Sequence, residues 1–176
     1  GMEYQFSKNT KAFVELAGSG YDVNTFSSIN NSDNYGYGGR LVFESKTPLR
    51  SEKKDVKLNT NVQLETVSSG FNRIERFRAV EFERNWNILN RTINSDQYIA
   101  DAEVSLSKDR VGKIGFGANT FFAGNEYTGI MNKVNGQLKS KGWNVSLVGS
   151  YLNTKGFSKS QFLRHKAAVS KKLSFI

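Results

Sequence analysis

A strict two-residue alternation of apolar and polar side chains constrains this chain more than any other feature of its sequence. It is clearest in the stretch Asp96–Phe122, where two alternating arms flank a polar turn at Lys108–Arg110. Successive side chains of a β-strand point to opposite faces, so each arm has one apolar and one polar face. The stretch therefore predicts a β-hairpin. Its apolar face comprises Tyr98, Ala100, Ala102, Val104 and Leu106 on the first arm and Ile114, Phe116, Ala118, Thr120 and Phe122 on the second.

The same alternation recurs along most of the chain, for example in Val56–Val67 and Gly142–Leu152. A length of 176 residues suits a single domain. The only proline is Pro48, and few prolines permit long, uninterrupted β-ladders. We therefore predict one all-β domain over residues 1–176, an antiparallel meander of about eight to ten strands that forms a barrel or part of a larger barrel.

The segment Asn72–Asn90 departs from this pattern. As a strand it would carry arginines on one face and glutamates on the other, so neither face could contact lipid. As a helix it would present an apolar stripe, with Asn72 and Glu75 spaced as a capping box. Its flanks are strand-like and Val, Phe and Trp are common in strands, so we favour a strand. The helical stripe would comprise Ala79, Phe82, Trp86, Leu89 and Ile93.

The net charge of +9 is concentrated in the last part of the chain. Residues 1–126 contain equal numbers of basic and acidic side chains, whereas residues 127–176 contain nine basic and no acidic ones. Such asymmetry indicates an acidic partner, although solvated turns and strand faces would give the same composition. If the last strands are neighbours, their bases form one anion-attracting sector. The predicted anion-binding residues are Lys139, Lys141, Lys155, Lys159, Arg164, Lys166 and Lys172.

Two environments fit the apolar faces of the predicted strands. The chain has no apolar run of about 18 residues, which excludes a transmembrane helix but leaves strands of about 9 to 11 alternating residues able to cross a bilayer. Aromatic side chains at the ends of apolar strand faces are typical of a membrane interface. A strand that packs on the core of a soluble protein would show much the same pattern. The predicted interfacial aromatics are Tyr35, Tyr37, Tyr98, Trp143 and Tyr151.

One string resembles a known class of proteins. Residues Arg78-Ala79-Val80-Glu81-Phe82-Glu83-Arg84-Asn85-Trp86 lie between long alternating hairpins with Asn-rich and Ser-rich loops. In this respect the chain resembles segments of the large outer-membrane β-barrel proteins of Bacteroidota-type bacteria, loosely from Tyr4 to Phe175. The resemblance implies a barrel wall and assigns no functional residue. The chain opens without a signal peptide and lacks the terminal aromatic residue common in such barrels, so we expect a segment of a larger barrel.

No motif indicates catalysis. The chain has no cysteine, and its one histidine, His165, has no nucleophile signature around it. The carboxylate pairs Glu81/Glu83 and Asp101/Glu103 follow from strand alternation alone. The glycine clusters around residues 36–39 and 115–117 are predicted to lie inside strands, where they cannot form a phosphate-binding loop. We expect no enzymatic activity, no metal and no cofactor, and we do not favour nucleic acid as the partner because no recognition motif accompanies the basic residues.

These observations lead to two functional hypotheses. The first is a non-catalytic β-barrel, or a segment of one, in a bacterial outer membrane with a structural or transport role. Its partners would be the lipid bilayer or an anionic glycolipid, together with other envelope proteins. The second is a soluble periplasmic or extracellular β-barrel or sandwich that binds a ligand or an anionic partner.

Overall fold

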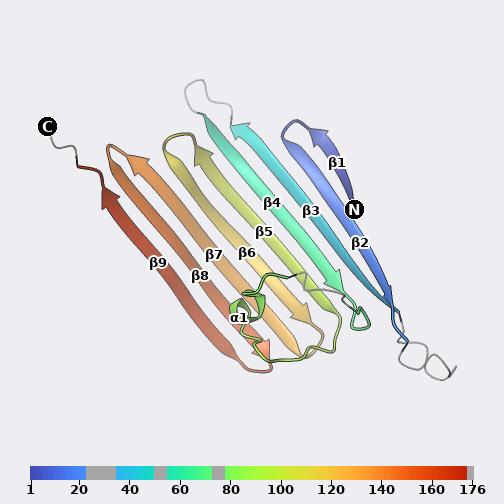
Figure 1. Cartoon of the computed structure of the whole chain (residues 1–176). Coiled ribbons are helices and arrows are strands. Elements are labelled where there is room, and N and C mark those ends of the chain that lie inside the picture. Colours follow the sequence, from blue (N-terminus) through green and yellow to red (C-terminus); the bar gives the residue numbers. More distant parts are fainter. Residues whose placement is uncertain (23–34, 50–54, 73–77, 174–176) are drawn as a thin grey trace.

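The described residues form one curved antiparallel sheet, in which nine strands follow one another in sequence order (Figure 1). The computed structural model describes residues 1–22, 35–49, 55–72 and 78–173. The predicted antiparallel meander of eight to ten strands is confirmed, and within the described residues the sheet is not closed into a barrel. The strands are β1 (Met2–Ser7), β2 (Thr10–Gly20), β3 (Tyr35–Leu49), β4 (Val56–Val67), β5 (Gln97–Lys108), β6 (Gly112–Ala123), β7 (Tyr127–Ser140), β8 (Trp143–Gly156) and β9 (Ser160–Lys171).

The predicted hairpin is the pair β5 and β6 at the centre of the sheet. Its register places Ala102 opposite Ala118 and Val104 opposite Phe116, as the alternation requires. Arg110 adopts a left-handed conformation in the turn, with φ of 63°. The predicted glycine clusters lie inside β3 and β6. Alternation therefore determined both the strands and which side chains share a face.

The two faces of the sheet differ sharply in chemistry. We call the face that carries Asp101, Glu103 and Asn119 the polar face, and the opposite face the apolar face. On the apolar face, large hydrophobic side chains remain exposed along almost every strand. Examples are Leu16 on β2, Tyr37 on β3, Leu64 on β4, Val104 on β5, Phe116 on β6, Leu138 on β7, Leu147 on β8 and Leu163 on β9. The exposed fraction of Phe116 is 53% and that of Leu163 is 71%, so the described residues leave this face uncovered.

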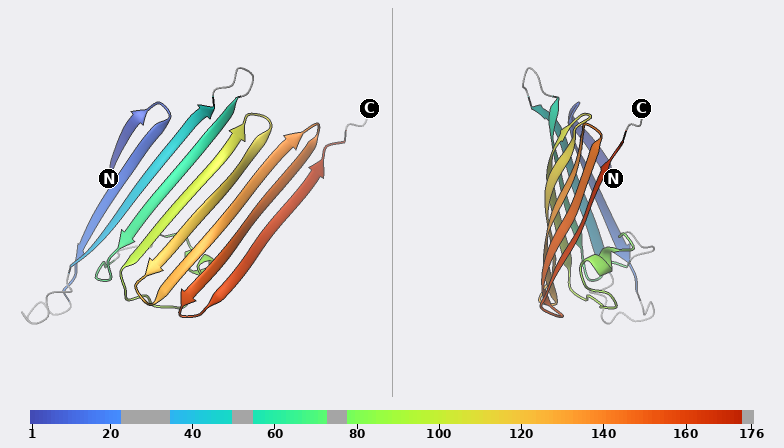
Figure 2. Two further views of the ribbon diagram at one scale, coloured as in Figure 1. Left: turned by 180° about the vertical axis from the view of Figure 1, so that it is seen from behind. Right: turned by 90° about the vertical axis from the view of Figure 1, so that its left-hand side faces the viewer.

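Residues 78–94, which we call the cover segment, connect β4 to β5 and lie against the polar face. The sheet curves around this side, and the short helix α1 (Phe82–Asn85) lies on its concave side (Figure 2). The strand prediction for Asn72–Asn90 is wrong in the described part of that range. Asn87 and Asn90 have positive φ angles of 57° and 60°, which strands and helices do not accommodate. The chain therefore folds into one helical turn and irregular loops.

The helical alternative anticipated part of this arrangement. Phe82, Trp86 and Ile93 face the sheet, as the predicted stripe requires, but Ala79 and Leu89 are exposed. The position before the helix is Glu81 rather than Asn72. The backbone N–H of Asn72 instead donates a hydrogen bond of 2.9 Å to Ser19 Oγ on β2. Glu75 of the predicted capping box lies outside the described residues.

The core lies between the cover segment and a small group of apolar residues on the polar face. We call this group the apolar island. Phe121 and Leu152 at its centre have exposed fractions of 0% and 1%. Trp86 packs edge-on against Phe121, with ring centroids 5.7 Å apart, and the Tyr127 hydroxyl donates a hydrogen bond to the Trp86 carbonyl. The apolar island comprises Ile99, Phe121, Ala123, Tyr127, Met131 and Leu152.

Two glycines allow the chain to lie this close to the sheet. A Cβ at Gly36 would lie 2.2 Å from the backbone nitrogen of Phe71, where residues 68–72 cross the start of β3. A Cβ at Gly129 would lie 2.9 Å from the six-membered ring of Trp86 and 2.6 Å from the Tyr127 hydroxyl. Any larger residue at either position would displace backbone or an aromatic ring that is already packed.

The first prediction concerns Gly129. Replacing it with alanine should lower the free energy of unfolding by about 1–3 kcal/mol, because the added methyl group overpacks the site of Trp86. Gly136, also on β7, is a matched control because a Cβ there meets nothing within 4 Å. Denaturant unfolding followed by tryptophan fluorescence measures both variants. Equal stability of Gly129→Ala and Gly136→Ala would contradict the packing described for Trp86.

Candidate functional site

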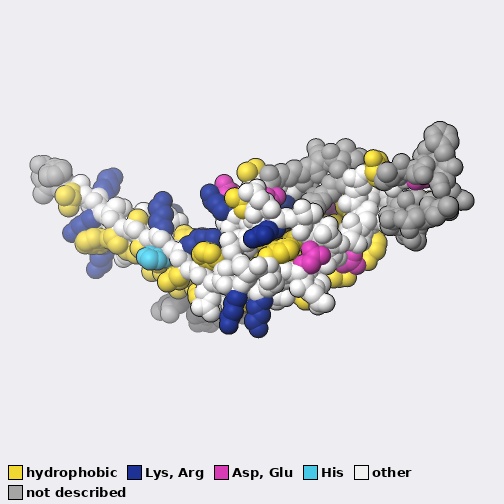
Figure 3. All heavy atoms as spheres, turned by 90° about the horizontal axis from the view of Figure 1, so that it is seen from below, with side chains coloured by type: hydrophobic (Ala, Val, Ile, Leu, Met, Phe, Trp, Pro, Cys, Tyr) yellow, Lys and Arg dark blue, Asp and Glu magenta, His cyan; other side chains and the backbone are white. Residues whose placement is uncertain are grey.

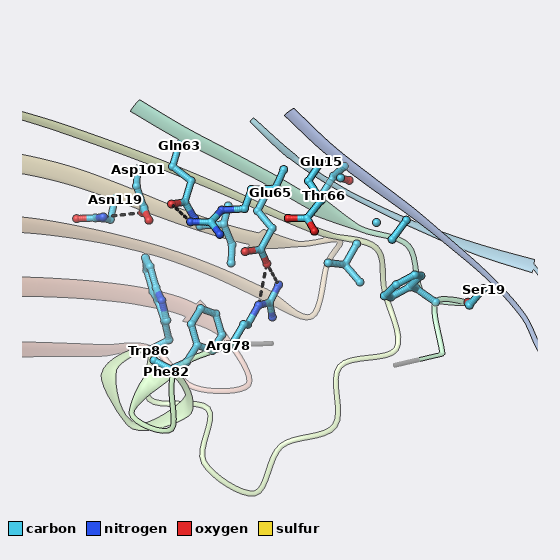
Figure 4. Close-up of a pocket in the computed structure, with 18 of the residues that line it drawn as sticks. Glu15, Ser19, Gln63, Glu65, Thr66, Arg78, Phe82, Trp86, Asp101 and Asn119 are labelled. Atoms are coloured by element: carbon cyan, nitrogen blue, oxygen red, sulfur yellow. Dashed lines mark hydrogen bonds and ion pairs between the residues drawn. The ribbon is translucent and has the colours of Figure 1, made fainter. Parts of the chain in front are cut away.

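A cavity lies on the polar face of the described structure, beside the cover segment. Its volume is about 860 Å³, and its lining residues come from β2 to β7, from residues 71 and 72, and from residues 78–86 (Figure 4). The floor combines polar strand residues with the apolar side chains of Val67, Ile99 and Met131. Phe82 on α1 and Trp86 directly after it form one wall. A cavity of this size could hold a small organic ligand. It is therefore the candidate binding site of the chain.

Arg78 fixes the cover segment to the cavity floor. Its guanidinium donates two hydrogen bonds to Glu65 Oε1, at 2.6 and 2.8 Å, and one of 2.6 Å to Gln97 Oε1. The side chains of Arg78 and Glu65 are only 11% and 12% exposed. The guanidinium also lies 4.5 Å from the ring centroid of Phe82. A charge pair so well bonded and so little exposed is costly to break from one side.

Further polar groups lie along the floor. Asn119 donates a 2.5 Å hydrogen bond to Asp101, and Arg40 donates one of 3.0 Å to Gln63 (Figure 4). These side chains lie on neighbouring strands, because Gln63, Asp101 and Asn119 share one row of the sheet register. Glu15 completes the lining on β2. The floor thus offers both hydrogen-bond donors and hydrogen-bond acceptors, which a polar solute requires.

Glu126 holds the far end of the cover segment. In the turn between β6 and β7, its carboxylate accepts a 2.7 Å hydrogen bond from the Ser95 hydroxyl and bonds of 3.1 and 3.3 Å from the backbone N–H of Asn94. These donors stabilise the ionised carboxylate, so they lower its pKa below the ordinary value. Together with Arg78, this carboxylate fixes the segment at both ends.

The structure brings only some of the predicted anion-binding residues together. Arg164 and Lys166 lie on the polar face of β9, facing the same side as the cavity. Lys139 and Lys141 lie at the β7–β8 turn, whereas Lys155 and Lys159 lie at the β8–β9 turn, at the opposite end of the sheet. Lys172 follows the end of β9. The bases thus lie on the last three strands but are divided between the two ends of the sheet, because consecutive turns of a meander alternate between its ends. Anion binding by these residues remains a prediction.

The charge distribution is visible from the end of the sheet that carries α1. In that view Lys and Arg side chains extend from the β9 side to the centre, while Asp and Glu side chains lie from the centre towards the β1 side (Figure 3). This follows from the sequence, because residues 127–176 contain no acidic side chain.

The predicted interfacial aromatics all lie on the apolar face. Tyr35, Tyr37 and Tyr98 are near one end of the sheet, where β3 and β5 begin, and Trp143 begins β8 at the other end. Tyr151 lies further along β8, opposite Leu163 of β9. Their exposed fractions range from 41% for Tyr151 to 80% for Tyr35.

The residues considered for catalysis are dispersed. His165 lies on the apolar face of β9, opposite Gly149 and away from the cavity. Glu103 forms an ion pair of 3.2 Å with Lys113, and Glu81 forms one of 2.7 Å with Arg84. Among the described residues, no three His, Cys, Asp or Glu side chains are grouped so as to hold a metal ion. Absence of enzymatic activity remains a prediction.

Two features were not predicted from the sequence: the residues that hydrogen-bond to the cover segment, and the apolar island. The pairing of Arg78 with Glu65 and Gln97 joins residues up to 19 positions apart and has no local pattern. The island did leave a signal, because Ile99, Phe121 and Leu152 are apolar residues at positions where the alternation requires polar ones. Such interruptions mark where something packs on a polar face.

Comparison with known proteins found no matching family model, no matching curated protein and no matching solved structure. In the described part of the chain, no helix has the length and apolar character needed to cross a membrane.

The second prediction tests the pair of Arg78 and Glu65. The substitution Glu65→Gln should lower the free energy of unfolding by about 1–3 kcal/mol, because it leaves a scarcely exposed guanidinium without its carboxylate. Glu103→Gln is the matched control on the same face, since the pair with Lys113 is about half exposed and should contribute about 0–1 kcal/mol. Chemical denaturation gives both values. Similar losses of unfolding free energy in the two variants would show that the ion pair of Arg78 and Glu65 stabilises the fold no more than an exposed pair.

The third prediction concerns pH and Glu126. Its pKa is lowered in the folded state, so its stabilising contribution is complete above the unfolded value of 4.5 and is lost as the pH falls through the lower folded value. The difference in stability between the wild type and Glu126→Gln should therefore be constant above that pH and shrink below it. Unfolding curves measured across the acid range test this. A difference independent of pH would refute the anchoring role of the carboxylate.

Proposed function

We propose that this chain forms part of the wall of a β-barrel in a bacterial outer membrane, with a structural or transport role and no catalysis. The apolar face contacts lipid in this arrangement, and the polar face lines an aqueous interior. The proposal rests on one observation. The folded connection lies on the polar face of the sheet, while the apolar face is left uncovered by the described residues.

This arrangement is the reverse of what a soluble sheet would show. In water, an antiparallel sheet packs its apolar face on the core and solvates its polar face. Here exposed apolar side chains are present on every strand from β1 to β9, whereas soluble monomers rarely carry apolar patches larger than a few hundred Å². Outer-membrane barrels combine an apolar exterior with a polar interior in this way.

Strand dimensions support the same environment. Apolar-face positions on β7 run from Thr128 to Leu138, and a tilted strand of about 9–11 residues spans the hydrocarbon core. Tyrosines at one end of the apolar face and Trp143 at the other occupy positions where amphipathic rings anchor a barrel at both interfaces.

The basic residues at the turns fit an anionic membrane surface. Lys139 and Lys141 lie at one end of the sheet, and Lys155 and Lys159 at the other. Lysines at a bilayer interface attract acidic headgroups or an anionic glycolipid. These four lysines are therefore assigned to lipid contact.

The free edges imply further strands. In the described residues β1 and β9 each have one hydrogen-bonded neighbour. Unpaired backbone groups are not tolerated in hydrocarbon, so both edges would pair with additional strands in a membrane. We propose that these come from the rest of a larger barrel or from another envelope protein.

The second candidate is a soluble periplasmic or extracellular protein that binds a ligand in the cavity. The cavity volume of about 860 Å³ and its polar floor favour it. In that case the apolar face would pack against another apolar surface instead of lipid.

The two tryptophans distinguish these alternatives, because Trp143 lies on the apolar face and Trp86 is buried on the polar side. The fourth prediction uses single-tryptophan variants, Trp86→Phe and Trp143→Phe, in bilayers with brominated acyl chains. A tryptophan in contact with the lipid should lose roughly half or more of its fluorescence, so the protein that retains Trp143 should be quenched. The protein that retains Trp86 should keep its emission.

Purification without detergent tests the opposite possibility, that the protein is soluble. If the chain purifies as a monomer without detergent and brominated lipid quenches neither tryptophan, the membrane proposal is wrong. Quenching of Trp86 alone would contradict the assignment of the two faces.

A further inference from the structure

The polar face is divided electrostatically along the sheet. On β1 to β6 its charged side chains are largely paired: Lys11 lies 3.1 Å from Glu3 and 3.8 Å from Glu44, and Lys113 lies 3.2 Å from Glu103. On β7 to β9 the polar face carries Lys139 near the β7–β8 turn and, closer to the cavity, Lys133, Arg164 and Lys166. Among the described residues, no acidic side chain lies within ion-pair distance of these three. No ion pair within the described chain therefore offsets their charge.

Register brings these three cations together. Lys133 is opposite Ser150, and Ser150 is opposite Arg164, so one small residue separates the two cations across the sheet. Neighbouring strands lie about 4.8 Å apart, which places the two Cα atoms about 10 Å from each other. Lys166 follows two positions after Arg164 on the same face, about 7 Å along the strand. Side chains of this length can converge on a single small anion.

Arg164 is held at the border of the cavity. Its guanidinium donates hydrogen bonds of 3.3 and 3.4 Å to the carbonyls of Arg84 and Asn85 at the end of α1, and it lies 5.7 Å from the centroid of the Phe162 ring. Asn85 and Lys133 both line the cavity. Lys133 and Arg164 therefore lie at the boundary of the cavity towards β9, and Lys166 is next to Arg164 on the same face.

We propose that Lys133, Arg164 and Lys166 bind the oxyanion group, phosphate or carboxylate, of a solute that enters the cavity on the polar face. Arginine and lysine are the residues that form charge-assisted hydrogen bonds with such groups. Asp101, Asn119 and Gln63 on the adjoining floor then contact the polar body of the same solute. The anion site needs only the folded sheet, and it extends the proposed function by naming the class of solute inside the barrel.

The position of the three cations favours a solute over a lipid headgroup as the bound anion. The three cations lie on the face opposite the exposed apolar side chains, whereas the lysines at the turns lie at the ends of the strands. Because all three cations are exposed, their field is screened over about 8 Å at physiological salt, so binding should be weak and should fall as salt rises.

The fifth prediction compares two triple variants of equal charge in neutral detergent at low ionic strength. The site variant is Lys133→Gln/Arg164→Gln/Lys166→Gln, and the control is Lys139→Gln/Lys141→Gln/Lys155→Gln. Titration calorimetry with inorganic phosphate and pyrophosphate should show affinity for the site variant weakened roughly tenfold or more, because charge-assisted hydrogen bonds are lost. The control should retain affinity within about threefold, because it loses only the distant field.

A second measurement, binding to lipid vesicles, tests whether the three cations bind a lipid headgroup instead of a solute. Binding to vesicles that contain phosphatidylglycerol should fall for the control variant and persist for the site variant. If the wild type binds neither phosphate nor pyrophosphate, or if both triple variants lose phosphate equally, the proposed site is wrong. If only the site variant loses binding to vesicles, the three cations contact lipid and the solute assignment is refuted.

The single variant Lys133→Gln guards against a folding defect. It leaves Arg164 and its contacts with α1 in place and should still weaken pyrophosphate binding roughly threefold, whereas unchanged binding would exclude Lys133 from the site. The outcome is separable from the membrane proposal. Phosphate binding without lipid quenching of Trp143 would refute the barrel and keep the anion site, and quenching without phosphate binding would refute the anion site alone.

Discussion

The contact between Trp86 and Phe121 decides which side of the sheet remains open. The apolar island is confined to the β6–β7 end of an otherwise polar face, and the cover segment brings just enough aromatic surface to bury it. No comparable segment reaches the other face in the described residues. Because hydrophobic burial is the main favourable term in folding, a chain that buries the smaller of its two apolar surfaces requires another medium for the larger. The proposed lipid contact follows from that imbalance.

Electrostatics on the polar face depends on the same arrangement. The cover segment brings Arg78 to Glu65, and its helix brings two backbone carbonyls to Arg164. One guanidinium is neutralised by a carboxylate, whereas the other contacts only partial charges. The segment therefore closes one side of the cavity with a satisfied ion pair and leaves uncompensated positive charge at the other. A solute in this space would meet a directional field, which favours one orientation of a molecule with a single anionic end.

Sequence periodicity predicted the sheet well because strand pairing in a meander is local. The apolar alternation of β5 and β6 fixed both the strands and the face of each side chain, as the pairing of Ala102 with Ala118 shows. The cover segment could not be predicted in the same way. Its conformation depends on distant partners such as Glu65 and Tyr127, and on positive φ at Asn87, which the periodicity of apolar residues does not record. Likewise, the charge excess of residues 127–176 was evident, but the division of its bases between strand faces and opposite turns required the register.

The outer edge of β9 has a consequence for how such a chain reaches its final state. The outer N–H and C=O groups of this 12-residue strand have no partner strand among the described residues, and such an edge is a template for aggregation when it is exposed to water. β9 carries Arg164, Lys166 and Lys171, and charges along an edge disfavour pairing with other copies of the same strand. The like charge of two such edges would keep newly made chains apart in an aqueous compartment. Before assembly, the basic residues of β9 would then disfavour pairing between the β9 edges of two copies until a complementary strand is in place.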